Sequence, residues 1–356
     1  MIRKANIMLI EAEKLEKVVS KIFNAAGCSN DEAACIARHL VDSNLCGHDS
    51  HGVIRVLRYI DFLKEGLVKP GQSIRMVFEN ETVAVVDGNF GFGQVIGEQT
   101  ITLLASKAKK TGLAMTALRN SAHLGRLGDW AEQLARERLV SLHFMNTTGR
   151  GMLAVPFGGT DRRQSLCPIC VCVPVEGRHP VLLDITTSVI AEGKLAVARN
   201  KKESVPPGII VDKDGNPTTD PNDFYAGGAL LHMGGHKGYG LNVIADILAG
   251  AFSGGGCTKP GVTQLINCLT SIAIDPAPFT DHDAYVAEIK RYAQWVTGSP
   301  PKDPDGKVLL PGDIEHQTRE QRRREGIPLD QSTWDQILEA GESVGISRSE
   351  IEALRV

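Results

Sequence analysis

The spacing of apolar residues changes twice along this chain of 356 residues, and that change restricts the folds it can adopt. Residues 11–45 and 53–65 are predicted to be helical, as are residues 315–325 and 333–356. Between them, in residues 73–297, short apolar runs that suit strands alternate with helical stretches. The pattern therefore predicts an α/β middle with helices at both ends.

The glycine pattern of a Rossmann nucleotide-binding turn is missing from this α/β middle. Gly91 and Gly93 come closest to it, but Ile96 stands where the third glycine is required. If the protein binds a dinucleotide, it must therefore use an anion site of another kind.

Composition argues against a nucleic-acid-binding, membrane-spanning or secreted protein. The formal net charge is -3, so no broad basic field exists to bind nucleic acid. The N-terminal residues resemble no signal peptide, and no apolar run reaches the ~18 residues that a membrane span needs. Eight cysteines are too few for a disulfide scaffold, so we expect a cytoplasmic protein. Cys167, Cys170 and Cys172 are interpreted as buried thiols, with a zinc or redox site as the alternative.

The most informative stretch, residues 47–55, reads Gly-His-Asp-Ser-His-Gly-Val-Ile-Arg. It gathers two imidazoles, a carboxylate and a hydroxyl, with the guanidinium of Arg55 just beyond. This mixture suits proton transfer beside an arginine that binds a carboxylate. His48 and Asp49 form its weaker half, because both could simply cap helix ends.

Two further polar turns precede predicted helices. Residues 234–240 place Lys237 in a glycine-rich loop, where backbone N–H groups and the lysine could hold a phosphate. A flexible loop with a solvated lysine is the alternative. Residues 120–126 follow a strand and contain His123, whose role could equally be structural or functional.

Asp184 ends the apolar strand of residues 181–183. A carboxylate at the end of a buried strand is costly unless it is paired, and an imidazole would be a suitable partner. The alternative is that Asp184 caps the next helix.

Taken together and in order, these stretches resemble the type-2 malate/L-lactate dehydrogenase family, the non-Rossmann NAD(P)-dependent 2-oxo-acid reductases. The resemblance covers nearly the whole chain and is strongest to the bacterial hydroxycarboxylate dehydrogenase branch. The matching stretches are residues 47–52 with Arg55 and Tyr59, then 123–125, 156–159, 183–188, 237–241, 311–313 and 325–327. Two departures stand out: Ser165-Leu166-Cys167-Pro168 replaces Gly-Thr-Asn-Pro, and Cys46 replaces an arginine.

The resemblance implies a non-Rossmann α/β fold with a mixed, largely antiparallel sheet covered by helices. A helical lobe would be built from both chain ends, residues 1–72 and 313–356. Residues 73–297 would form the core that binds cofactor and substrate, which a helical insertion near residues 120–150 could interrupt. It also implies a homodimer.

The implied reaction is hydride transfer between the nicotinamide of NAD or NADP and C2 of a 2-hydroxy or 2-oxo acid. The family pattern assigns Ser50, His51 and Asp184 to a proton relay and His123 to a possible acid/base role. It assigns Arg55 and Tyr59 to the substrate. The residues expected to bind the cofactor are His123, Leu124, Gly125, Arg126, Thr147, Asp184, Thr186, Ser188, His236, Lys237, Gly238, Gly312 and Asp313.

The mechanism we expect has protonated His51 donating to the substrate oxygen while Asp184 stabilises the imidazolium. Arg55 would hold the substrate carboxylate through two parallel hydrogen bonds. Two alternatives remain: a metal-dependent hydrolase that uses His48 and His51, and a nucleotide-binding descendant without activity. The sequence predicts no metal ligand set for the dehydrogenase, and it leaves the particular acid and the choice between NAD and NADP open.

Overall fold

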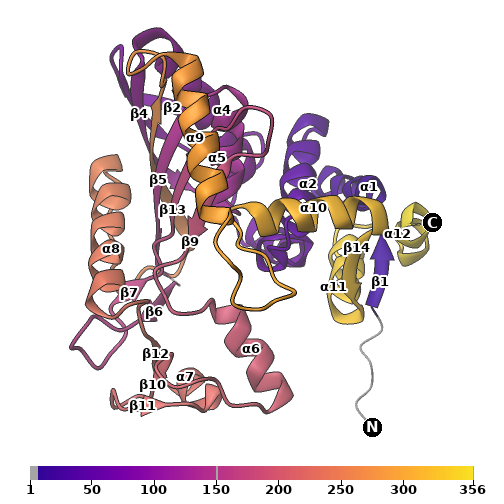
Figure 1. Cartoon of the computed structure of the whole chain (residues 1–356). Helices are drawn as coiled ribbons and strands as arrows, with labels where there is room; N and C mark the ends of the chain where they lie inside the picture. The colour runs from indigo at the N-terminus through magenta and orange to yellow at the C-terminus, as the bar shows by residue number, and fades with distance from the viewer. Residues whose placement is uncertain (1–6, 150, 356) are drawn as a thin grey trace.

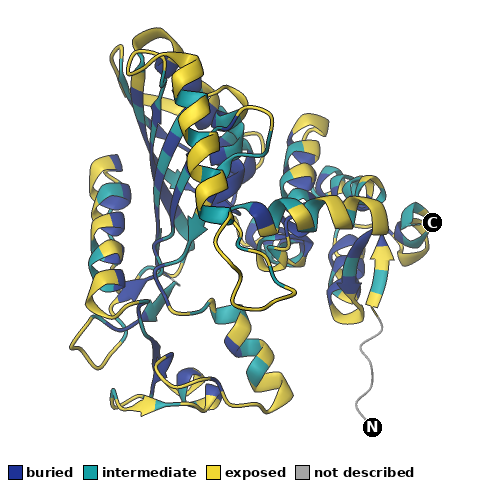
Figure 2. Ribbon diagram, viewed as in Figure 1, coloured by how far each residue is buried: buried dark blue, intermediate teal, exposed yellow. Residues whose placement is uncertain are grey.

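The computed structural model describes residues 7–149 and 151–355. Figure 1 shows a central sheet with helices on both sides, a helical lobe that holds β1 and α12, and a smaller sheet below them. Figure 2 shows that the most buried segments are the strands of the central sheet and the inner faces of the lobe's helices. Within the described part of the chain, no helix is long and apolar enough to cross a membrane.

The central sheet has seven strands. In spatial order they are β2 (Arg75–Glu79), β3 (Val83–Asp87), β4 (Leu113–Ser121), β13 (Ile266–Ile274), β5 (Val140–Thr148), β8 (Ile169–Val173) and β9 (Val181–Ile185). Only β3 and β4 run parallel, because α4 (Gly93–Thr111) supplies the crossover between them. The expected mixed, largely antiparallel sheet is thus confirmed.

Helices cover both faces of this sheet. On one face lie α4 and α5 (Leu127–Arg136), which bury Trp130 and Leu104 among apolar strand residues. On the other lie α8 (His236–Asp246) and the π-helix η3 (Ile247–Ala251) that continues it. The helical lobe and α8 therefore lie on opposite sides of the central sheet (Figure 1).

The helical lobe is built from both chain ends, as expected. Its elements are β1 (Ile7–Ile10), α1 (Ala12–Ala25), α2 (Asn30–Leu45), α3 (Val56–Lys64), β14 (Ile327–Asp330), α11 (Gln331–Glu342) and α12 (Arg348–Arg355). Phe23 and Ile36 from the N-terminal half share one apolar core with Trp334 and Ile351. The domain boundaries stay a prediction, and residues 1–6 and 356 lie outside the described residues.

A smaller sheet, which the sequence did not predict, connects to the central one. Its order is β11 (Pro217–Thr218), β10 (Ile210–Val211), β12 (Ala229–Leu230), β6 (Met152–Ala154) and β7 (Gln164–Ser165), with α6 (Glu192–Lys201) and α7 (Pro221–Tyr225) packed nearby. Strands of two or three residues are too short to carry a recognisable alternation. The remaining helices are α9 (His282–Thr297) and α10 (Asp313–Glu325), and α10 packs on α2.

Candidate active site

The loop of residues 47–55 is held in a fixed shape by the end of α2. Two 3₁₀ turns, η1 (Asp49–His51) and η2 (Val53–Arg55), carry it into α3. Asn44 binds both turns: its Oδ1 accepts the Val53 N–H at 2.8 Å, and its Nδ2 donates to Asp49 Oδ1 at 2.7 Å. A Cβ on Gly52 would lie 2.1 Å from Asn44 Oδ1, so this close approach requires glycine.

This loop brings His51 against His123, which lies in the turn between β4 and α5. The two rings stack with centroids 5.6 Å apart and planes inclined by 16°. Tyr59 of α3 places its hydroxyl 2.6 Å from His123 Nδ1, and Ser50 Oγ lies 3.0 Å from His51 Nδ1. We call Ser50, His51, Tyr59 and His123 the imidazole cluster.

Arg55 gives the imidazole cluster a positive charge. Its Nε donates to the Ser50 carbonyl at 2.6 Å. Burial, followed by the charges of Arg55 and His48, lowers the pKa of His51 to about 3. Burial and Arg55 also hold the pKa of His123 well below its usual value. Both shifts favour the neutral imidazole near pH 7 in the protein without substrate, and the expected proton donation from His51 to a bound substrate stays a prediction.

Asp184 does not complete the expected relay within one chain. Its Oδ2 accepts the N–H of Gly128 at 2.7 Å, at the first turn of α5, where unpaired backbone donors favour a carboxylate. Burial raises the pKa of Asp184, although His48 and Arg126 lower it. No hydrogen bond in the described residues joins Asp184 to His51. The Ser50–His51 link of the relay is thus formed, and the link to Asp184 is not.

Arg126, which we expected to bind the cofactor, pairs with three carboxylates, and its Nη1 has no hydrogen-bond partner in the described residues. It is only 1% exposed, and its Nη2 lies 2.5 Å from Asp129, 3.0 Å from Glu132 and 3.5 Å from Asp42. A buried guanidinium needs such partners to offset its loss of hydration. Arg319 of α10 joins the same network through Asp42 and Glu132.

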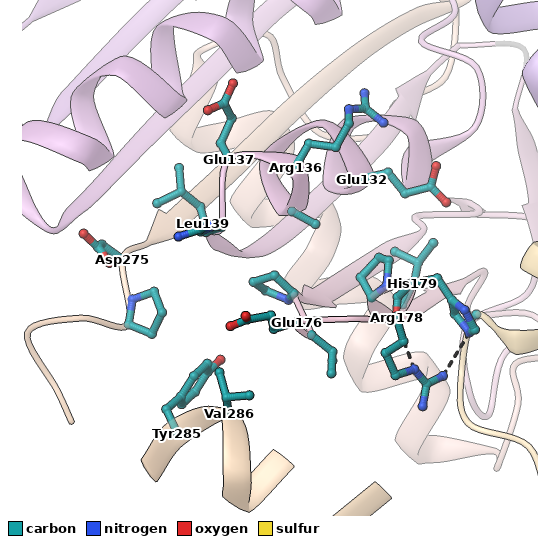
Figure 3. Close-up of a pocket in the computed structure, with 18 of the residues that line it drawn as sticks. Glu132, Arg136, Glu137, Leu139, Glu176, Arg178, His179, Asp275, Tyr285 and Val286 are labelled. Carbon is teal, nitrogen blue, oxygen red and sulfur yellow. Dashed lines mark hydrogen bonds between the residues drawn. The ribbon is translucent and has the colours of Figure 1, made fainter. Parts of the chain in front are cut away.

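A cavity of about 610 Å³ lies beside this network, between α5, the β8–β9 turn, α9 and α10. Figure 3 shows Arg178, His179 and Glu132 on its wall. Gly312 lies on the wall of the cavity and Asp313 does not, and the expected role of both residues in cofactor binding stays a prediction. The Asp313 carboxylate instead accepts hydrogen bonds from Arg178 at 2.5 Å and from His179 at 2.6 Å, and so fixes both side chains.

The size of this cavity suits one half of a dinucleotide. Volumes of 300–1,000 Å³ are typical of small-molecule sites. Arg178 and Arg319 lie on its wall, where Asp313 already binds Arg178 and two carboxylates bind Arg319, so the buried Nε of Arg319 is the donor without a hydrogen-bond partner in the described residues. A Cβ on Gly312 would come within 3.1 Å of Leu182 Cβ, so a larger residue would crowd this wall.

The Lys237 loop begins α8. Lys237 is exposed in the first turn, and His236 packs its ring against Phe157 with centroids 5.8 Å apart. A Cβ on Gly238 would lie 2.2 Å from the Met233 carbonyl, so this glycine permits a tight backbone turn. Among the described residues, no hydrogen bond or ring contact joins this loop to the imidazole cluster, and α8 lies across the sheet from the helical lobe (Figure 1).

The remaining predicted cofactor residues lie at or just beyond the ends of β4, β5 and β9. Thr147 on β5 accepts a hydrogen bond from Asn267, and Asn267 accepts the N–H of Leu124 at 2.9 Å. Gly125 adopts a φ of 76°, which favours glycine. Asn267 therefore couples the His123 turn to the sheet, and sequence reasoning missed it because its partners lie 143 and 120 residues away.

Asn242 of α8 is another residue that sequence reasoning missed. It accepts the N–H of Cys167 at 2.9 Å and donates to the Ser165 carbonyl at 3.1 Å. It thus fixes the stretch in which this chain departs from the family pattern. Nearby, the hydroxyls of Thr186 and Ser188 lie 3.4 Å apart at the end of β9.

Comparisons with known proteins identify the family. The family model described as "Malate/L-lactate dehydrogenase" matches residues 10–338. Hydroxycarboxylate dehydrogenase B of Escherichia coli strain K12 is 39% identical over 350 residues, which are 96% of each chain. L-lactate dehydrogenase of Cupriavidus necator is 34% identical, covering 96% of this chain and 99% of its own.

Solved structures give the same result. Sulfolactate dehydrogenase from Methanocaldococcus jannaschii superposes with a TM-score of 0.88 at 30% identity, covering 97% of this chain and 99% of its own. These relatives do not favour a hydrolase or a protein without activity. The chain therefore belongs to the malate/L-lactate dehydrogenase family and is an oxidoreductase of the 2-hydroxyacid dehydrogenase class.

Proposed function

We propose that the imidazole cluster interconverts a 2-hydroxy acid and its 2-oxo acid with NAD or NADP as the second substrate. The observation that carries this proposal is the stack of His51 on His123 beside the charge of Arg55. Two neutral imidazoles can exchange a proton with a substrate oxygen, and one guanidinium can hold its carboxylate.

Arg55 would bind the C1 carboxylate of the substrate. The Ser50 carbonyl holds its Nε, which leaves both Nη groups available for a carboxylate. No acidic side chain among the described residues forms a salt bridge with it. Two parallel hydrogen bonds would fix the direction of C2 relative to the imidazoles.

His51 would accept the hydroxyl proton during oxidation and return it during reduction. Its neutral state suits the oxidation direction directly. A bound carboxylate would offset the charge of Arg55, which is one cause of the lowered His51 pKa, and would move that pKa toward neutrality. Ser50, at 3.0 Å from Nδ1, would keep the ring oriented.

The cavity beside Gly312 would hold one half of the cofactor, with Arg178 and Arg319 as donors. The rest of the cofactor is proposed to lie along Thr147, Asp184, Thr186, Ser188 and the turn of residues 123–125. When bound, the nicotinamide supplies or accepts the hydride at C2 of the substrate. The donors of the cavity suit either NAD or NADP.

We also propose that the protein is a homodimer. Large apolar side chains are exposed on α8, at the start of η3 and just after η3: Leu241, Ile244, Ile247 and Phe252, which are 44%, 53%, 43% and 55% exposed. A second copy covering these side chains would remove an apolar surface of the kind that marks interfaces. Ile244→Glu should shift the mass measured by analytical ultracentrifugation toward the monomer.

The eight free cysteines support a reducing, cytoplasmic location.

A matrix of 2-oxo acids against NADH and NADPH tests the activity. His51→Ala should lower kcat by roughly 10²–10⁴-fold, while cofactor affinity, measured by fluorescence titration, stays the same. Near-normal turnover in His51→Ala would indicate that His123, and not His51, is the acid/base. If His51→Ala and His123→Ala both left turnover unchanged, the proposal would fail.

A further inference from the structure

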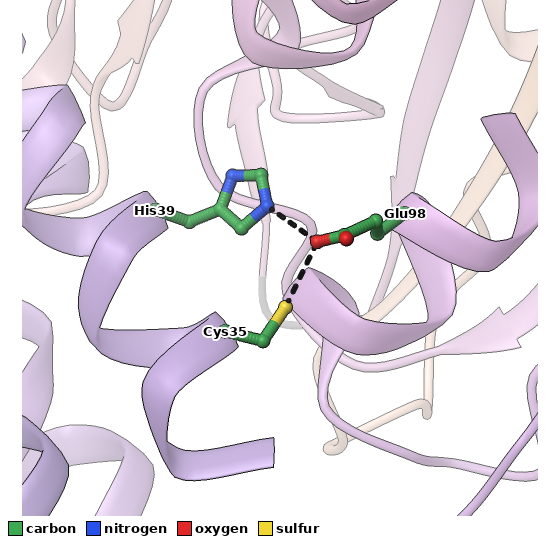
Figure 4. Close-up of side chains that lie close together, drawn as sticks. All are labelled: Cys35, His39 and Glu98. Carbon is green, nitrogen blue, oxygen red and sulfur yellow. Dashed lines mark hydrogen bonds and ion pairs between the residues drawn. The ribbon is translucent and has the colours of Figure 1, made fainter. Parts of the chain in front are cut away.

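A second group of reactive side chains lies where α2 of the helical lobe meets α4 of the central core. Cys35 and His39 are one turn apart on α2, and Glu98 faces them from α4 (Figure 4). Cys35 Sγ lies 3.2 Å and His39 Nε2 lies 3.4 Å from the same oxygen, Glu98 Oε2. None of these residues belongs to the imidazole cluster.

These distances match the separations between ligand atoms around a tetrahedral zinc ion. Bonds of roughly 2.0–2.3 Å to sulfur, nitrogen and oxygen place neighbouring ligand atoms about 3.3–3.6 Å apart. All three ligand atoms here lie within 4.8 Å of one another. A thiol, an imidazole and one carboxylate favour Zn²⁺ over Mg²⁺ or Ca²⁺, which prefer oxygen ligands.

A second observation points to a metal: the far side of the imidazole ring is already supported. His39 Nδ1 lies 3.2 Å from Asp129 Oδ2, and only 6% of the Asp129 side chain is exposed. Zinc-binding histidines almost always donate their other ring N–H to a carboxylate, a backbone carbonyl or water, which orients the ring. Cys35 and Glu98 also line a groove of about 780 Å³, which would supply a water molecule as the fourth ligand.

Arg38 competes for the same carboxylate. Its guanidinium contacts Glu98 and lies 3.8 Å from Cys35 Sγ. Because 55% of its side chain is exposed, it can turn into solvent when a cation takes its place. The acidic cluster of Asp42, Asp129 and Glu132 differs, because Arg126 and Arg319 neutralise it from buried positions.

We propose that Cys35, His39 and Glu98 form a zinc site that ties the helical lobe to the central core. Binding releases the thiol proton of Cys35 and the proton between His39 and Glu98, and it forms one bond from each residue to the metal. The same helix α2 ends in Asn44, which holds the loop of residues 47–55, so the metal would also stabilise the base of that loop.

The test uses the full chain in a reductant that keeps the cysteines as thiols, contains no thiol itself and binds metals weakly. The metal-free protein is titrated with Zn²⁺ against a chromophoric chelator and separately with Co²⁺, whose thiolate charge-transfer band reports a sulfur ligand. Cys35→Ser and Glu98→Gln are compared with Cys257→Ser. Cys257 is a matched control, because it and Cys35 are the only cysteines that are not fully buried.

We expect the wild type and Cys257→Ser to behave alike. Each should bind one equivalent of Zn²⁺, show a Co²⁺ charge-transfer band and unfold at a higher temperature when Zn²⁺ is present. Cys35→Ser should lose the band, and both ligand variants should bind Zn²⁺ more than about tenfold more weakly, since losing even an outer partner costs 10–100-fold. Equal Zn²⁺ affinity in wild type and Cys35→Ser, or no tight binding in the wild type, would overturn the proposal. Neither result depends on dehydrogenase activity.

Discussion

The Tyr59 hydroxyl lies 2.6 Å from His123 Nδ1, and Gln94 Nε2 donates to the same hydroxyl at 3.2 Å. Since Gln94 supplies a proton to this oxygen, the hydroxyl is oriented to donate its own proton to Nδ1. His123 is then neutral with its proton on Nε2, which is a hydrogen-bond donor beside His51. This assignment rests on the hydrogen-bond network, and it gives the two stacked imidazoles different roles.

Tyr59→Phe removes the group that selects this tautomer. We expect kcat to fall roughly 5–15-fold, which corresponds to a hydrogen bond of about 1–1.5 kcal/mol, with little change in cofactor affinity. Steady-state kinetics measure the effect. Tyr225→Phe is the matched control, because its hydroxyl contacts Glu192 in the smaller sheet region. An unchanged kcat in Tyr59→Phe would show that the tautomer is set by another group.

Arg55→Lys keeps the charge and loses the planar fork. A lysine cannot form two parallel hydrogen bonds with a carboxylate, nor reproduce the bond from Nε to the Ser50 carbonyl. KM for the 2-oxo acid should rise roughly 10–100-fold, as expected for charged hydrogen bonds of about 1.5–3 kcal/mol. KM for the cofactor should stay the same. Arg58→Lys on the outer face of α3 serves as the control; if both variants behaved alike, Arg55 would not bind the substrate.

Gly52→Ala tests how the loop of residues 47–55 is held. The added Cβ would lie 2.1 Å from Asn44 Oδ1, so either the loop or the asparagine must move. We expect a free energy of unfolding lower by about 1–3 kcal/mol, as in other overpacked sites, together with a marked loss of kcat. Gly193→Ala is the control, because a Cβ there meets nothing within 4 Å. Normal activity in Gly52→Ala would mean that the loop adapts at no cost.

Local patterns made much of the fold predictable. The helices of both chain ends follow from apolar spacing, and Ser29 caps α2 by accepting the N–H of Glu32 at 3.2 Å, as its sequence position suggested. The loop of residues 47–55 could be identified because its unusual residues are consecutive. Features of this kind depend on neighbours in sequence.

Partnerships between distant residues could not be predicted. Asp184 binds the Gly128 N–H, 56 residues away, and Arg126 pairs with Asp42, 84 residues away. A sequence indicates that a buried charge needs a partner, but several candidates satisfy that need and only the fold selects one. The pairing of β1 with β14 escaped prediction for the same reason, since the paired strands lie at opposite ends of the chain.

His143 links the stability of the protein to pH. It is fully buried on β5, between the hydroxyls of Ser271 at 2.8 Å and Ser141 at 3.0 Å, and burial lowers its pKa to about 3. The unfolded chain has a histidine pKa near 6.5. Between about pH 6.5 and pH 3 the unfolded state therefore binds a proton that the folded state does not, and stability falls as the pH falls.

For this one residue, unfolding should become easier by about 1.4 kcal/mol between pH 7.5 and pH 5.5. His143→Gln keeps hydrogen bonding to both serines without a titrating group, so its loss of stability over that interval should be smaller by the same amount. Urea unfolding of both proteins at the two pH values, at one protein concentration, measures the difference. If the variant lost as much stability as the wild type, His143 would have to be protonated in the folded protein or remain unprotonated when the chain unfolds.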